Sequence, residues 1–212
     1  RKDNTLEFKS ILEPSCGSCE YIKSLDTHYN NVDITGIEYN TEIYQQINAL
    51  SWSGKNTIGL IHGDFLKYQS DTKYDLIIGN PPYYVIKKAQ VEKKYLQYFD
   101  GRPNIFLLFI IHSLNLLTPE GILSFVLPKN FLNCQYYNKL RAHIYTKYTI
   151  IDIIDCSQGN YLETNQDTVI MMVQNRVPTD NDKYSIVLPH SDSSVLPHSD
   201  SSVLPHSDSS VL

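Results

Sequence analysis

The most specific chemical signal in the sequence is the run Asn80-Pro81-Pro82-Tyr83, which directly follows an apolar, strand-like segment. Two consecutive prolines lack backbone N–H donors and keep the preceding residue extended, so the Asn80 side chain and nearby carbonyls present hydrogen-bond acceptors in a fixed array. Such an array beside an aromatic ring suits a planar substrate with an NH₂ group, because two acceptors take its hydrogens while Tyr83 stacks on its plane. A rigid turn with a buried tyrosine is the alternative interpretation.

Three further groups precede this motif, and each follows its own strand-like segment. The first is a turn of small residues, Glu13-Pro14-Ser15-Cys16-Gly17. Its backbone amides can approach a ligand closely, and Glu38, 21 residues beyond Gly17, has the spacing of a carboxylate that accepts hydrogen bonds from ribose hydroxyls. Asp64 can accept from an adenine amino group, and Phe65 can cover the ring face. Each group alone is more often structural, but their order at successive strand ends favours a ligand with ribose and adenine.

The elements that must position these groups can be read from the alternation of short apolar runs with longer segments of mixed polarity. The predicted strands span residues 10–12, 33–37, 57–62, 74–78, 122–127, 150–155 and 168–173. The predicted helices span 20–26, 41–49, 104–117 and 135–145, and the turn at 118–121 closes the third. No helix is evident between the last two strands. We therefore expect an α/β fold with a doubly wound, Rossmann-like sheet of seven strands, mostly parallel with an antiparallel edge strand.

The composition separates a folded part from a repetitive tail. Of the 212 residues, 42% are hydrophobic and 19% are charged, which is sufficient for a domain with its own core. From Val187 the unit Val-Leu-Pro-His-Ser-Asp-Ser-Ser occurs three times, with too few apolar residues to pack against a neighbour. The sequence predicts a catalytic domain over residues 1–176 and a disordered low-complexity tail over 177–212.

The net charge of −5 argues against a broad nucleic-acid-binding surface, since phosphates are normally met by clustered Lys and Arg. One stretch after the catalytic motif is locally basic and rich in aromatic residues. It contains Lys87, Lys88, Lys93, Lys94 and Arg102 together with Tyr84, Tyr95, Tyr98 and Phe99. Because a nucleic acid would have to approach at this position, we expect phosphate contacts here. A solvated loop or helix face is the alternative.

The remaining composition signals concern metals and membranes. Cys16 and Cys19 form a Cys-x-x-Cys pair, but Cys134 and Cys156 supply no second pair, so we expect no metal. The longest purely apolar run, residues 105–111, is too short to cross a bilayer, and no leader-like segment precedes the first strand. The sequence therefore predicts a cytoplasmic protein without a membrane partner.

Taken together, the motifs resemble those of S-adenosylmethionine-dependent DNA adenine-N6 methyltransferases of the γ-type order, over about residues 10–175. The resemblance rests on Glu13-Pro14-Ser15-Cys16-Gly17, Glu38, Asp64-Phe65 and Asn80-Pro81-Pro82-Tyr83. It implies that the first turn wraps the methionine part of S-adenosyl-L-methionine, that Glu38 binds its ribose, and that Asp64 with Phe65 holds its adenine. Cys19 departs from the usual glycine at the third small position.

The resemblance also implies a mechanism. Accepting both N–H hydrogens of adenine N6 at the Asn80 side-chain oxygen and the Pro81 carbonyl localises the nitrogen lone pair, which can then attack the sulfonium methyl group. Because the amino group is paired and stacked in a duplex, the base must be flipped into a slot faced by Tyr83. In similar enzymes a second stacking aromatic comes from the loop before the last strand, where Tyr161 is the match.

Several alternatives remain open at this stage. Methylation of a release-factor glutamine amide uses the same catalytic motif but typically an Asp-Leu-Gly-type first motif, so DNA adenine, as in restriction-modification methylases, is favoured. RNA methylation is a weaker candidate, and a non-catalytic methyltransferase-like binding module is the non-enzyme one. Because relatives of this order usually carry a target-recognition domain, a separate specificity domain or subunit is a further expected partner besides DNA.

Overall fold

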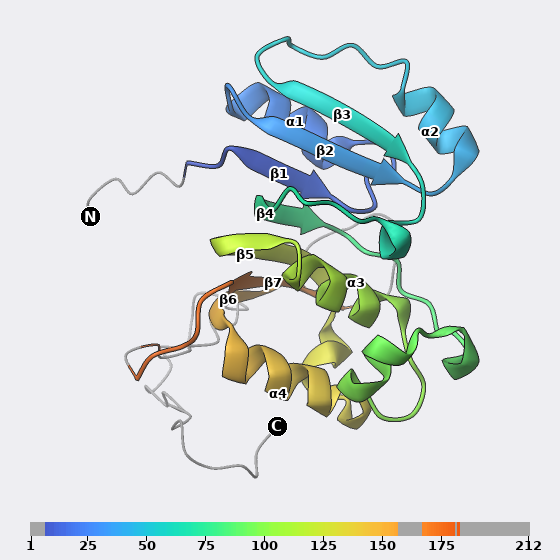
Figure 1. Ribbon diagram of the computed structural model, residues 1–212, viewed down its shortest axis with the longest axis vertical. Coiled ribbons are helices and arrows are strands. Elements are labelled where there is room, and N and C mark those ends of the chain that lie inside the picture. Colours follow the sequence, from blue (N-terminus) through green and yellow to red (C-terminus); the bar gives the residue numbers. More distant parts are fainter. Residues whose placement is uncertain (1–6, 157–166, 181, 183–212) are drawn as a thin grey trace, which may run out of the picture.

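A single seven-stranded sheet forms the centre of the protein, as seen in a computed structural model that describes residues 7–156, 167–180 and 182 (Figure 1). The strands are β1 (Ser10–Glu13), β2 (Asp33–Glu38), β3 (Thr57–His62), β4 (Tyr74–Gly79), β5 (Leu117–Pro128), β6 (Thr149–Asp155) and β7 (Thr168–Gln174). Their order in the sheet is β3-β2-β1-β4-β5-β7-β6. The first five strands pair in parallel, and β7 runs antiparallel to both β5 and β6. The predicted sheet, with its antiparallel pair at one edge, is confirmed.

Helices cover both faces of this sheet. They are α1 (Glu20–His28), α2 (Thr41–Ile47), α3 (Ile105–Leu114) and α4 (Asn138–Lys147), with short 3₁₀ helices η1 (Phe65–Lys67), η2 (Lys88–Gln90), η3 (Lys93–Tyr98), η4 (Lys129–Leu132) and η5 (Gln135–Tyr137). Successive residues of β4, Leu76 and Ile77, are both buried, one in the core under α1 and the other in the core under α3 and α4. Burial on both faces explains why the strands read as continuous apolar runs. Within the described ranges, every helix is too short or too polar to span a membrane.

The third helix ends earlier than the sequence predicts. The predicted helix over 104–117 with a closing turn at 118–121 is wrong at its C-terminal end, because α3 stops at Leu114 and Leu117 already belongs to β5. The Tyr74 N–H donates to the Leu116 carbonyl (2.8 Å), and the Thr118 hydroxyl donates to Asp75 (3.0 Å). Pairing with β4 therefore outweighs the local turn preference of this segment.

The topology brings four loops to one edge of the sheet. The parallel strands β1 to β4 point in the same direction, to the right in Figure 1. Their last residues are Glu13, Glu38, His62 and Gly79. Because ligands of such sheets bind beyond the carboxyl ends of the strands, this edge is where the site is expected.

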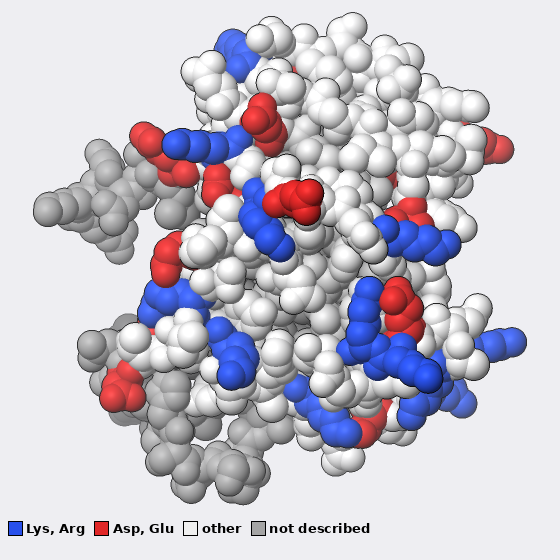
Figure 2. Space-filling model, in the orientation of Figure 1, with Lys and Arg blue, Asp and Glu red and all other residues white. Residues whose placement is uncertain are grey.

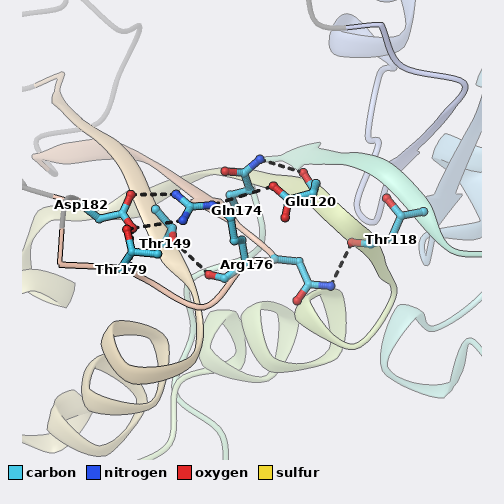
Figure 3. Close-up of polar contacts among 8 residues, drawn as sticks. Thr118, Glu120, Thr149, Gln174, Arg176, Thr179 and Asp182 are labelled. Carbon is cyan, nitrogen blue, oxygen red and sulfur yellow. Dashed lines mark hydrogen bonds and ion pairs between the residues drawn. The ribbon is translucent and has the colours of Figure 1, made fainter.

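The chain after β7 remains attached to the sheet as far as Asp182 (Figure 3). The Arg176 guanidinium donates to both carboxylate oxygens of Asp182, at 3.1 and 2.7 Å, and its carbonyl accepts from the Thr149 hydroxyl at 3.0 Å. The bonds from Arg176, together with those from the Thr179 N–H and hydroxyl, hold the pKa of Asp182 well below its usual range. The folded contacts thus extend past the predicted domain boundary at residue 176, and residues 183–212 lie outside the described residues.

Candidate functional site

The turn after β1 is attached to the end of β2. The Cys16 N–H donates to the Ile37 carbonyl, and the Gly17 N–H donates to the Glu38 carboxylate, both at 2.9 Å. Gly17 has φ +49°, in the left-handed region that favours glycine. Cys19 stands where the resemblance implies a glycine, and it also has a positive φ, of 63°. This backbone conformation favours glycine, which explains why glycine is the residue expected at this position.

Glu38 is the bridge between two loops of the site. One carboxylate oxygen accepts from Gly17 and the other accepts from the Asn40 N–H at 2.6 Å. The side chain is largely buried, with 8% of its surface exposed. Because each carboxylate oxygen has two lone pairs, both retain capacity for a hydroxyl of a ligand.

Glu13, at the end of β1, is a buried carboxyl group with one unpaired oxygen. It is 2% exposed, and its Oε2 has no hydrogen bond among the described residues. Burial raises the pKa of Glu13 to about 9, and the neighbouring Cys19 adds to the shift. The group is therefore neutral at pH 7, and its Oε2 is a buried acceptor without a donor.

A cavity of about 480 Å³ opens next to these residues. It is lined by Tyr39, Asn40, Thr41, His62, Gly63 and Asp64. The Asp64 carboxylate accepts from the Leu66 N–H at 3.0 Å and so caps η1. Of the lining residues, sequence analysis named Asp64 and missed Tyr39, Asn40, Thr41 and His62. Their position at the ends of β2 and β3 was the signal that could have identified them.

Phe65 does not face this cavity. Its side chain is 2% exposed and packs against Phe109 and His112 of α3, with ring centroids 4.9 and 4.8 Å apart. The ring thus belongs to the core in this structure, and its predicted contact with a ligand ring stays a prediction. Tyr39 is the aromatic side chain that lines the cavity, and 76% of its surface is exposed.

The turn Asn80-Pro81-Pro82-Tyr83 lies against the turn at residues 13–17. The Ser15 hydroxyl donates to the Asn80 carbonyl at 3.2 Å, and a Cβ placed on Gly79 would lie 3.5 Å from the Pro14 ring. Asn80 is exposed, and Pro81 behind it is buried. The structure thus brings the residues of the Asn80-Pro81-Pro82-Tyr83 motif together with the turn at 13–17.

The Tyr83 hydroxyl lies within hydrogen-bond distance of two acceptors. It lies 2.5 Å from Asn80 Oδ1 and 2.6 Å from the Val126 carbonyl, and the Tyr83 ring meets Phe106 edge-on. Burial raises the pKa of the Tyr83 hydroxyl well above its ordinary value, so it stays a donor. The amide oxygen predicted to accept a substrate N–H is therefore bonded to this hydroxyl in the structure.

Two further residues complete the description of the site. Tyr84 is half exposed, and burial together with the nearby Asp64 carboxylate raises the pKa of its hydroxyl. Tyr161 lies outside the described residues. Within the described ranges, no group of three His, Cys, Asp or Glu side chains is arranged to hold a metal ion.

Comparison with known proteins gives consistent matches. The family model of the Eco57I restriction-modification methylases matches residues 16–161. The type II methyltransferase M.CvrRI of Paramecium bursaria Chlorella virus XZ-6E is 29% identical over 181 residues, covering 84% of this chain and 46% of that protein. A tRNA1(Val) (adenine(37)-N6)-methyltransferase of Aliivibrio fischeri is 32% identical over 108 residues, covering 50% of this chain and 44% of that protein. The chain thus spans less than half the length of these relatives.

The fold also matches solved structures. A protein of Listeria monocytogenes, assigned to the class I S-adenosylmethionine-dependent methyltransferases, superposes with a TM-score of 0.72 at 18% identity. The superposition covers 87% of this chain and 59% of that chain. The sheet is therefore the Rossmann-like sheet of class I methyltransferases.

Proposed function

Because the chain belongs to the Eco57I restriction-modification methylase family, we propose that it methylates the N6 amino group of adenine in DNA after the base has left the duplex. S-adenosyl-L-methionine supplies the methyl group, which its sulfonium makes electrophilic. The observation that carries the proposal is the hydrogen bond between Ser15 and the Asn80 carbonyl, because it fixes an acceptor-bearing turn beside the turn at 13–17. Adenine N6 is also the methylated atom named for the tRNA relative.

Residues at and after the carboxyl ends of β1, β2 and β3 fit the proposed cofactor. The unpaired Oε2 of Glu13 suits the ammonium group of its methionine part, because that charge would favour the ionised carboxyl. The free lone pairs of Glu38 suit the ribose hydroxyls, and the Asp64 carboxylate suits the adenine amino group. Tyr39 is the residue that we propose to cover the adenine ring.

The acceptor amine is proposed to bind at Asn80 Oδ1 and the Pro81 carbonyl. Taking up both N–H hydrogens localises the nitrogen lone pair, and the same oxygens stabilise the positive charge that develops on nitrogen during attack. As the nitrogen–carbon bond forms, the bond between the methyl group and sulfur would break, the cofactor would leave as a neutral thioether, and the methylated nitrogen would lose one hydrogen as a proton to solvent. The prolines support this role, since they fix the direction of both acceptors without moving during the reaction. The bond from the Tyr83 hydroxyl takes one lone pair of Asn80 Oδ1 and leaves the other for the amine, and the Val126 carbonyl is a second acceptor for the same hydroxyl.

The N6 group is inaccessible inside a duplex, so we propose that the base is flipped and stacked on the Tyr83 ring, with Tyr161 as the second stacking residue. Target-sequence recognition is proposed to belong to a separate domain or subunit. In the described part of the chain, the sheet, its helices and their connections contain no further domain for that purpose. Methylation of adenine in RNA is the second candidate, because of the similarity to the tRNA relative.

Methyl transfer to different acceptors tests the proposal. The chain is incubated with methyl-labelled S-adenosyl-L-methionine and with duplex DNA, tRNA or a release factor. We expect label in DNA, as N6-methyladenine, from the wild type and from Asn48→Ala, a control at an exposed residue in the C-cap of α2. Asn80→Ala should give none. Label in tRNA alone would favour the RNA candidate, label in protein would favour glutamine-amide methylation, and cofactor binding without transfer would favour a binding module.

A further inference from the structure

The segment between β4 and α3 begins directly after the catalytic turn in the sequence, and its two ends lie side by side in space. Val85 forms an antiparallel bridge with Asn104, and the Ile86 N–H donates to the Pro103 carbonyl at 3.0 Å. At its far side the segment is tied to η5 by a bond from the Asp100 N–H to the Tyr136 carbonyl at 3.1 Å. The segment is thus fixed relative to Asn80.

This segment carries positive charge in a chain whose net charge is −5. Residues 85–104 contain five Lys or Arg and two acidic residues. Both acidic residues are already paired, Glu92 with Lys94 at 3.0 Å and Asp100 with Lys139 at 2.6 Å. The other four cations are exposed and make no ion pair with the described residues: Lys87, Lys88, Lys93 and Arg102.

Three of these cations surround a hollow of about 370 Å³. It is lined by Val85, Ile86, Lys87, Lys88, Gly101, Arg102 and Pro103. Gly101 has φ +77°, and a Cβ there would lie 2.7 Å from the Tyr136 ring, so the turn that presents Arg102 packs closely on its neighbour. Figure 2 shows Lys and Arg side chains gathered over the segment that follows β4, on the side of the molecule toward which β1 to β4 point in Figure 1.

We propose that Lys87, Lys88 and Arg102 hold the sugar-phosphate backbone of duplex DNA beside the catalytic turn. The choice of DNA as the partner rests on the proposed function. Unpaired cations on a fixed segment supply affinity that does not depend on sequence, which is the kind of contact that positions a duplex without reading it. Holding the duplex here would keep the target base next to Asn80 while the base is extruded.

Salt-dependent DNA binding tests this surface. Binding of a fluorescent duplex without a known recognition site is measured by anisotropy between 50 and 200 mM salt, a range over which about three phosphate contacts change affinity strongly. The test variant carries Lys87→Gln, Lys88→Gln and Arg102→Gln. The control carries Lys9→Gln, Lys55→Gln and Lys147→Gln, which remove the same charge from exposed residues just before β1, β3 and β6, at the opposite edge of the sheet.

We expect the test variant to lower affinity at least about tenfold at low salt and to reduce the slope of log K against log salt by about 2 to 3, at about 0.9 per phosphate contact. The control should change the slope by less than about 1. Equal losses in both variants, wild-type binding by the test variant, or no DNA binding by the wild type would each overturn the proposal. Tighter binding of a duplex RNA that depends on the same three residues would overturn the assignment to DNA.

DNA binding through these three cations can be measured independently of methyl transfer. Asn48→Ala, outside the proposed site, should bind DNA with the wild-type affinity and salt slope. Salt-dependent binding through the three cations without any methyl transfer would refute the proposed function and leave this surface standing. Methyl transfer to DNA by a test variant that binds DNA normally would refute this surface and leave the proposed function standing.

Discussion

The Tyr83 hydroxyl donates to Asn80 Oδ1, so two residues of one motif are bonded to each other at 2.5 Å. The bond uses one of the two lone pairs of the acceptor that the proposed mechanism assigns to the substrate amine. A second acceptor, the Val126 carbonyl at 2.6 Å, is available to the same hydroxyl. If the amine displaces the hydroxyl from Asn80, Tyr83 therefore keeps a partner, and the exchange costs at most about one neutral hydrogen bond, or about 1 kcal/mol.

Removing only this hydroxyl should spare the reaction. Tyr83→Phe keeps the ring and frees Asn80, so we expect kcat within about threefold of the wild type and no increase in KM for DNA. Tyr83→Ala also removes the stacking surface and should lower kcat/KM by about 10- to 100-fold. Steady-state kinetics with both variants decides the matter. A loss in Tyr83→Phe as large as that in Tyr83→Ala would show that the hydroxyl itself is required.

Tyr39 and Phe65 should separate cofactor binding from stability. Tyr39→Ala removes an exposed ring from the cavity, so we expect S-adenosyl-L-methionine to bind about tenfold more weakly with an unchanged melting temperature. Phe65→Ala removes a ring from the core and should cost about 3 to 5 kcal/mol of unfolding free energy. Calorimetric titration and thermal unfolding measure the two effects. Normal cofactor affinity in Tyr39→Ala would refute the role of this residue.

Glu13 should make stability depend on pH. Burial raises the pKa of Glu13 to about 9 in the folded protein, against about 4.5 for an exposed carboxyl. Between these values the folded state keeps a proton that the unfolded state has lost, so the unfolding free energy falls as pH rises, by at most about 1.4 kcal/mol per unit. Below about pH 4.5 the effect is absent, and above about pH 9 it is constant.

Glu13→Gln removes this titration. Urea unfolding at pH 6, 7 and 8 should show the variant gaining stability relative to the wild type as pH rises. Glu42→Gln, at an exposed carboxyl in the first turn of α2, is the control and should give a constant offset. Parallel pH profiles for the wild type and Glu13→Gln would contradict the raised pKa.

The sequence predicted the parts of the fold that depend on local pattern. The strands lie within about two residues of their predicted bounds, except that β5 begins five residues earlier, at Leu117. That start depends on pairing with Tyr74, which is distant in sequence and has no local signal. Residues at strand ends, such as Glu38 and Asp64, were predictable because topology alone brings them to one edge.

Side-chain direction was the part that the sequence could not predict. Phe65 was assigned to the ligand because it follows Asp64, yet its ring packs against Phe109, 44 positions away in the chain. The bond between Tyr83 and the Val126 carbonyl likewise joins the turn after β4 to β5, which become neighbours only in the folded sheet. Both features depend on tertiary packing, which no short motif encodes.

The most direct test of the central claim is the single-turnover rate of methyl transfer to adenine in DNA with Asn80→Ala. The substitution keeps the backbone carbonyl that accepts from Ser15 and removes only the side-chain acceptor. We predict a loss of at least about 100-fold in rate, the effect of removing one preorganised hydrogen bond to a developing charge, with cofactor affinity within about twofold of the wild type. Transfer at the wild-type rate would contradict the account.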